Sequence, residues 1–141
     1  MSLRLTIPVL LLTALGCGRR DSASAGVWTG PWQATFVVDS ASTLHPSPAQ
    51  RAVEGEIVLN DSSGTHGIDF TPLLGHPLPN RLSWWRTADS LALRLGPGGY
   101  DDGTLDMSGA YAADSIAGSW MESAYCCGAS GHFVLHRRHA A

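Results

Sequence analysis

The stretch Ile116–Arg138, IAGSWMESAYCCGASGHFVLHRR, decides the fold. Apolar and polar residues alternate over Ile116–Trp120 and again over Phe133–Arg137, which is the period of a β-strand with one buried face. A loop rich in Gly, Cys and Ser separates the two segments, as in an antiparallel hairpin. The stretch is therefore predicted to form two paired strands.

The rest of the chain repeats this pattern. Alternating segments occupy residues 28–38, 53–59, 82–85, 91–95 and 105–111, and a shorter one contains Ile68 and Phe70. Gly-, Asn- and Pro-containing turns separate them, and no segment after the first hydrophobic stretch has apolar residues at helical spacing. About eight short strands predict an all-β, up-and-down antiparallel barrel, with a two-sheet β-sandwich as the alternative.

The first hydrophobic stretch predicts export. Leu5–Leu15 follows Arg4 and precedes Arg19 and Arg20. It is too short to span a bilayer, which takes about 20 residues, so residues 1–16 are predicted to be a signal peptide.

Ala14-Leu-Gly-Cys17 resembles the lipobox of bacterial lipoproteins. The resemblance implies that Cys17 is lipidated and becomes the first mature residue. Residues 17–25 would then be a lipidated tether and residues 26–138 the barrel domain. Ala23-Ser-Ala25 is an alternative site of ordinary secretory cleavage, but Arg and Asp residues separate it from the apolar stretch.

These features predict a protein anchored to the membrane of the bacterial cell envelope by lipid. Gly18 stands where retained inner-membrane lipoproteins have Asp, so we expect the periplasmic face of the outer membrane in a cell that has one. The chain has 9 basic residues, all Arg, and 12 acidic ones, with no basic stripe, which argues against a nucleic-acid partner. After the signal peptide, its length suffices for one domain.

The two ends of the predicted domain resemble lipocalin and avidin-like barrels. Gly26-Val-Trp28 opens the first strand, and Arg137 shares the apolar register of the last strand, two residues after Leu135. The resemblance implies that Arg137 lies across the Trp28 ring and closes the barrel base. A guanidinium over an indole makes a favourable cation–π contact.

The inward registers allow two interpretations of the interior. They contain large aromatic residues beside small ones, namely Gly55, Gly109 and Gly118, which either leave a pocket or let the strands coil. A pocket would hold a small apolar ligand, with candidate contacts Trp32, Trp84, Tyr111 and Trp120. The alternative is a filled barrel core with no ligand, an outer apolar patch around Trp85 and an envelope protein partner that the sequence does not identify.

The remaining reactive residues do not form a recognisable catalytic pattern. Cys126 and Cys127 are adjacent, so a disulfide between them would be strained, since Cα atoms about 3.8 Å apart are closer than disulfides prefer. A redox-active or ligand-contacting pair, a loop staple and an intermolecular link all stay open. His132 and His136 lie about 13 Å apart along one strand, too far for one zinc ion. No catalytic residue, metal or cofactor is predicted, and an enzyme is not expected.

Overall fold

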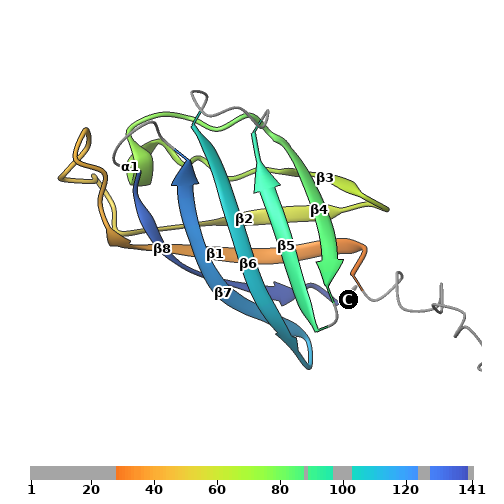
Figure 1. Ribbon diagram of the computed structural model, residues 1–141. Helices are drawn as coiled ribbons and strands as arrows, with labels where there is room; N and C mark the ends of the chain where they lie inside the picture. The colour runs from red at the N-terminus through yellow and green to blue at the C-terminus, as the bar shows by residue number, and fades with distance from the viewer. Residues whose placement is uncertain (1–27, 88, 97–102, 124–127, 140–141) are drawn as a thin grey trace, which may run out of the picture.

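The computed structural model describes residues 28–87, 89–96, 103–123 and 128–139, and this part of the chain forms eight strands and one short helix (Figure 1). The strands are β1 (Gly30–Ser40), β2 (Ala52–Leu59), β3 (Ser63–His66), β4 (Arg81–Thr87), β5 (Ser90–Leu95), β6 (Thr104–Ala112), β7 (Ser115–Ser123) and β8 (Ser130–Arg137), and the helix is α1 (Thr71–Leu74). Each strand pairs antiparallel with the next, and β8 returns to β1, so the sheet closes into a barrel. The predicted up-and-down barrel is confirmed.

The predicted hairpin forms the closing seam. β7 and β8 pair from Ser115 opposite His136 to Met121 opposite Ser130. The other side of β8 pairs with β1, where Trp32 lies opposite Arg137 and Phe36 opposite Phe133. The two ends of the folded part are therefore neighbours in one sheet.

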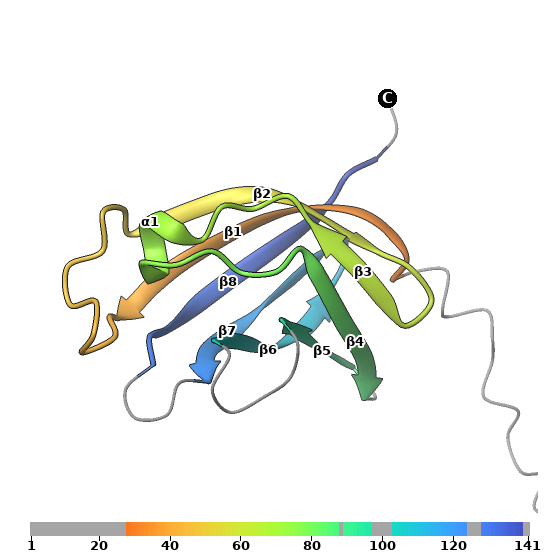
Figure 2. The same ribbon diagram turned by 90° about the horizontal axis from the view of Figure 1, so that it is seen from above.

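Alternate side chains of every strand point into the barrel and make one core. Phe36 lies at its centre, with ring centroids 5.0 Å from Phe70 and 6.0 Å from Phe133. Viewed from above, β1 and β2 lie on one side of this core and β4 to β6 on the other (Figure 2). The largest fully buried side chains are Trp32, Trp120, Phe36, Phe70, Phe133, Ile57, Leu59, Leu73, Leu91, Leu93, Leu95 and Leu105.

The third strand is not where the alternation predicts it. β3 lies earlier, and Ile68 and Phe70 are buried in an irregular connection that leads to α1. Gly64 has no side chain and packs against the Val58 carbonyl and Leu82, so the sheet continues through this polar segment. Pro72 lies in the first turn of α1, where its missing N–H costs no hydrogen bond.

The two ends of the barrel differ. The β1–β2 connection and α1 lie at one end, where the Gln50 amide donates to the Pro72 carbonyl (3.1 Å) and Leu73 and Leu74 are buried. The first residues of β1 and the last of β8 lie at the opposite end (Figure 1). Among the described residues, no helix is long and apolar enough to cross a bilayer.

Candidate functional site

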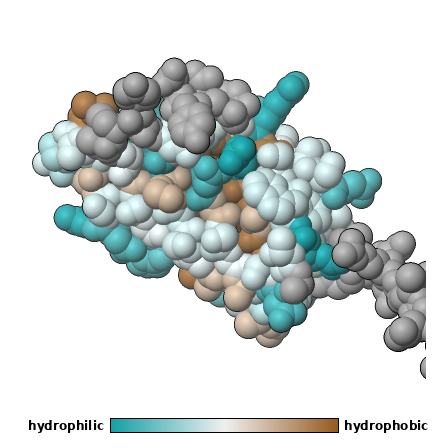
Figure 3. Space-filling model, in the orientation of Figure 1, coloured by the Kyte–Doolittle hydropathy of each residue, from teal (hydrophilic) through white to brown (hydrophobic). Residues whose placement is uncertain are grey.

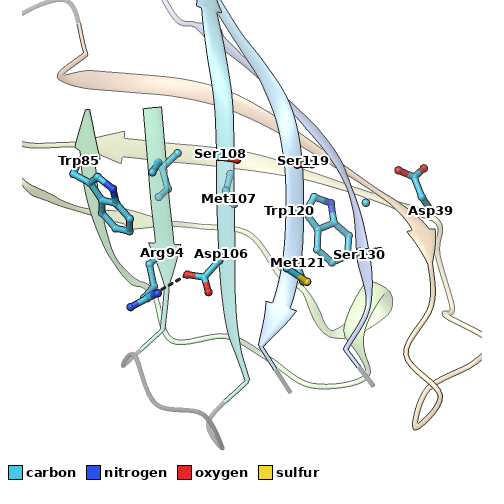
Figure 4. Close-up of a pocket in the computed structure, with 13 residues that line it drawn as sticks. Asp39, Trp85, Arg94, Asp106, Met107, Ser108, Ser119, Trp120, Met121 and Ser130 are labelled. Atoms are coloured by element: carbon cyan, nitrogen blue, oxygen red, sulfur yellow. Dashed lines mark hydrogen bonds and ion pairs between the residues drawn. The ribbon is translucent and has the colours of Figure 1, made fainter. Parts of the chain in front are cut away.

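A groove crosses the outer face of the barrel. Its volume is about 500 Å³. Six neighbouring strands, β4 to β8 and β1, contribute to it (Figure 4). The lining residues are Asp39, Trp85, Ala92, Leu93, Arg94, Asp106, Met107, Ser108, Ser119, Trp120, Met121, Ser130 and Gly131.

Strand register explains why a depression forms here. Trp85 lies opposite Ala92, which pairs with Ser108, which in turn pairs with Ser119. Because the side chains of Ala92, Ser108 and Ser119 are small, the surface is depressed along this row. The larger ring of Trp85 bounds the depression at one end. Figure 3 shows this face, formed by β4 to β7, as mostly pale residues with small brown areas and hydrophilic residues between them.

Two large apolar side chains of the groove remain exposed. Trp85 is 46% exposed and Met121 is 62% exposed. Trp84, the residue before Trp85 on β4, points the other way and is buried. A single exposed apolar residue is common on a folded surface, but Trp85 and Met121 line the same groove, and this makes the groove a candidate binding site.

A fixed guanidinium lies along one side of the groove. Arg94 Nε donates to Asp106 Oδ1 (2.6 Å), and Ser123 Oγ donates to Asp106 Oδ2 (2.9 Å). The hydrogen bond to Asp106, with the attraction of its charge, raises the pKa of Arg94 above its ordinary value. The terminal nitrogens of Arg94 have no hydrogen bond to another described residue, so these donors are free to bind a ligand.

A second polar pair lies at the β1 end of the groove. Asp39 accepts a hydrogen bond from His132 Nδ1, at 2.9 Å for the nearer carboxylate oxygen. Ser119 lies opposite His132 on β7, but no hydrogen bond joins their side chains. Among the described residues, no serine or cysteine side chain is hydrogen-bonded to His132 in this pair.

The four predicted ligand contacts do not surround one described cavity. Trp32, Trp84 and Trp120 are buried in the core, while Tyr111 is half-buried against Trp28, with ring centroids 4.8 Å apart. Of the four, only Trp120 lines the groove.

The three buried indoles are already satisfied by the protein backbone. Trp32 Nε1 donates to the Trp28 carbonyl (3.0 Å), Trp84 Nε1 to Asn60 (2.7 Å) and Trp120 Nε1 to Val37 (3.1 Å). These polar groups hold the barrel together and are not presented to a ligand.

Core side chains fill the space beside three inward glycines. A Cβ at Gly55 would come within 2.6 Å of Ile68 Cγ1, and one at Gly109 within 2.9 Å of Phe133 Cζ. At Gly118, a Cβ would instead meet the backbone of Ser108 and Gly109, and at Gly131 it would lie 2.8 Å from the Trp120 ring. These glycines accommodate large neighbours and do not leave voids of their own.

The predicted partner of Arg137 is wrong. Its guanidinium lies over Trp32, 4.8 Å from the ring centroid, and not over Trp28. The register places Trp32 directly opposite Arg137, whereas the chain turns at Gly30 (φ 107°) and brings Trp28 onto Tyr111. The cation–π contact across the seam exists, but the next tryptophan makes it.

Glu122 is the important inward residue that the sequence analysis missed. It is 7% exposed, and its carboxylate accepts hydrogen bonds from His76 Nε2 (2.6 Å) and the Ala129 amide (3.0 Å). This pair fastens the segment after α1 to the β7–β8 end of the barrel. On β7, Glu122 follows Ile116, Gly118 and Trp120 at every second residue, and these positions face inward. This alternation could have been used to predict from the sequence that Glu122 also faces inward.

A second buried polar side chain, His66, is held as a neutral ring. Its Nδ1 accepts from the Ile68 amide (3.3 Å), and its Nε2 donates to the Pro79 carbonyl (2.6 Å). Burial lowers the pKa of His66, an effect that the two backbone hydrogen bonds partly oppose. His66 therefore joins the β3–β4 connection to the core in its uncharged form.

The described residues contain no group of three or more His, Cys, Asp or Glu side chains placed to hold a metal ion. Cys17, Cys126 and Cys127 lie outside the described residues. Comparisons with known proteins give no match, whether with family models, curated proteins or solved structures. The class that the chain itself defines is an eight-stranded antiparallel β-barrel with an outer groove.

Proposed function

We propose that this protein is a lipid-anchored binding protein of the bacterial cell envelope that acts through the outer groove of its barrel. The single observation that most supports this proposal is the difference in exposure between two adjacent tryptophans on β4. Trp84 is buried with its indole N–H paired to backbone, while Trp85 lies exposed at the end of a groove. The interior then serves stability and the outer face serves recognition.

The proposal selects one of the two sequence hypotheses. A small apolar ligand inside the barrel would need free space and free polar groups there, but three indole N–H groups are bonded to backbone and three inward glycines are covered. A lipoprotein that has a filled core and binds its partner through its outer surface needs neither free space nor free polar groups inside the barrel. Anchoring through Cys17, export and outer-membrane residence belong to the proposal on the lipobox resemblance alone.

In-cell photo-crosslinking tests the role of the groove. A photoreactive amino acid replaces Met121, which lines the groove, or Leu44, which is 80% exposed but does not line it. We expect the probe at Met121 to capture a protein or glycan in the native envelope, and this capture to disappear with Trp85→Ala. Equal capture from Leu44, or capture at Met121 that ignores Trp85→Ala, would contradict the proposal.

A further inference from the structure

We infer that the ligand of the groove is a neutral oligosaccharide. The inference rests on the proposed function and adds the chemical class of the ligand. It follows from the length of the groove, its aromatic platform and the kind of polar groups along it.

The shape of the groove fits an elongated ligand. Its lining runs from Trp85 on β4 to Asp39 on β1, across six adjacent strands. Five interstrand spacings correspond to about 24 Å along the curved wall of the barrel, so the straight distance between the two ends is shorter. A single sugar ring or an amino acid would cover only part of this length, whereas a chain of several rings would follow it.

Trp85 offers a flat apolar surface at one end. Trp85 is 46% exposed, and its ring makes no ring contact with another described aromatic residue. The face of an indole is negatively polarised, and the C–H groups on one face of a pyranose ring are weakly positive, so the two stack favourably. The small side chain of Ala92 beside Trp85 leaves room for such a ring.

The polar groups match hydroxyls in both hydrogen-bonding directions. The free terminal nitrogens of Arg94 donate, and the Ser108 and Ser119 hydroxyls donate or accept. The hydroxyls of Ser108 and Ser119 have no hydrogen bond to another described residue. A ligand with many hydroxyl groups would satisfy these atoms.

The charges of the groove disfavour an acidic ligand. Arg94 is paired with Asp106, and Asp39 with His132, so no uncompensated cation faces the groove from the described residues. An acidic ligand would meet two carboxylates. Electrostatic complementarity therefore selects an uncharged chain over a polyanion.

The closed barrel argues against an extended peptide. Peptides commonly bind sheets by adding a strand to a free edge, where backbone groups are unpaired. β1 pairs with β8 here, so each of the six strands under the groove has a neighbour on both sides. A peptide across their faces would find few partners for its own backbone.

Binding of defined oligosaccharides tests the inference. Full-length protein in detergent is titrated with cellotetraose, chitotetraose and maltotetraose, with a proline-rich decapeptide as the comparison probe, while Trp fluorescence and heat are measured. We expect one or more of the sugars to bind, Trp85→Ala to weaken binding at least tenfold, and Trp85→Phe, which keeps a flat ring, to retain most of it. Leu44→Ala, outside the groove, is the matched control, and circular dichroism checks that each variant is folded.

The inference is overturned if none of the three sugars binds at millimolar concentration, if only the decapeptide binds, or if Trp85→Ala binds sugar as tightly as wild type. Its failure is distinguishable from failure of the proposed function. If the probe at Met121 captures a partner only when Trp85 is present, but no sugar binds, the groove is still a recognition site and its ligand is not a neutral oligosaccharide. Absence of both results would end both proposals.

Discussion

Replacing Glu122 tests a buried polar contact of the described barrel. Glu122→Ala removes the acceptor of the Ala129 amide, and Ala129 is 1% exposed, so water does not replace the lost partner. A buried N–H without a partner costs about 1 to 3 kcal/mol. The His76 contact adds about 0 to 1 kcal/mol, because the His76 side chain is 40% exposed and an exposed pair is weak.

Glu122→Ala is therefore expected to lower the free energy of unfolding by about 1 to 4 kcal/mol. In a domain of this size it should lower Tm by roughly 10 °C. Calorimetry and urea titration of the folded domain measure both values. Glu54→Ala, at an exposed position on the outer face of β2, is the control and should change stability by less than about 0.5 kcal/mol.

Glu122→Gln separates hydrogen bonding from charge. His76 Nδ1 faces the Pro77 carbonyl and Nε2 faces Glu122, so only the doubly protonated ring donates to both acceptors. With Gln, the amide carbonyl still accepts from Ala129 and the amide NH₂ donates to a neutral His76. Glu122→Gln should therefore lower the free energy of unfolding by less than about 1 kcal/mol. Equal losses for the Ala and Gln variants would refute the hydrogen-bond account, as would an Ala variant as stable as wild type.

Four other changes are expected to give defined results. Arg137→Ala should cost about 1 to 2 kcal/mol, because the contact with Trp32 and the packing of the side-chain stem are both lost; an unchanged unfolding midpoint would contradict this. Burial lowers the pKa of His66 below its ordinary value of 6.5, so the unfolded chain binds a proton where the native ring does not. Stability should therefore fall as the pH drops below about 6.5, and melting curves of His66→Gln should show a weaker pH dependence if His66 is the cause. Gly109→Ala should cost about 1 to 3 kcal/mol in chemical denaturation, since its Cβ overlaps a core phenyl ring; a stability equal to wild type would mean that free space lies there. Cys17→Ser should move the protein from the membrane fraction to the soluble one or leave it unprocessed, and a mature N-terminus at residue 26 in mass spectrometry would exclude lipidation at Cys17.

Alternation was sufficient to predict the barrel. Positions 32, 34, 36 and 38 of β1 and 91, 93 and 95 of β5 are buried as their period of two requires. Short loops between successive strands then favour neighbouring antiparallel pairs, which is the observed order.

Local chain direction was harder to predict. Arg137 was expected to lie across Trp28, but Gly30, the first residue of β1, has a positive φ and turns the chain away from that position. Likewise, the polar residues before Gly64 favoured a turn, although this glycine packs inside the sheet. Both errors arise at a glycine: Gly30 turns the chain through its positive φ, and Gly64 allows close packing because it has no side chain.

The groove could not be predicted because it depends on register between strands. The sequence shows that Ala92, Ser108 and Ser119 point outward, but not that they align in one row. The sequence predicts an exposed apolar patch around Trp85. The row of small residues beside Trp85 can be recognised only when three strand pairings are known. Sequence parity alone, by contrast, would have placed Glu122 inside.

The most direct test of the central claim compares the indole N–H resonances of the tryptophans in ¹H–¹⁵N spectra while ligand is added. Trp84 and Trp85 are adjacent in sequence and lie on opposite faces of the barrel wall, so they report separately on the interior and the groove. An oligosaccharide probe should shift the Trp85 resonance, with Trp32 and Trp84 unchanged, and oleate should leave Trp32 and Trp84 in place. Shifts at Trp32 and Trp84 with a stationary Trp85 would show a ligand inside the barrel and contradict the account.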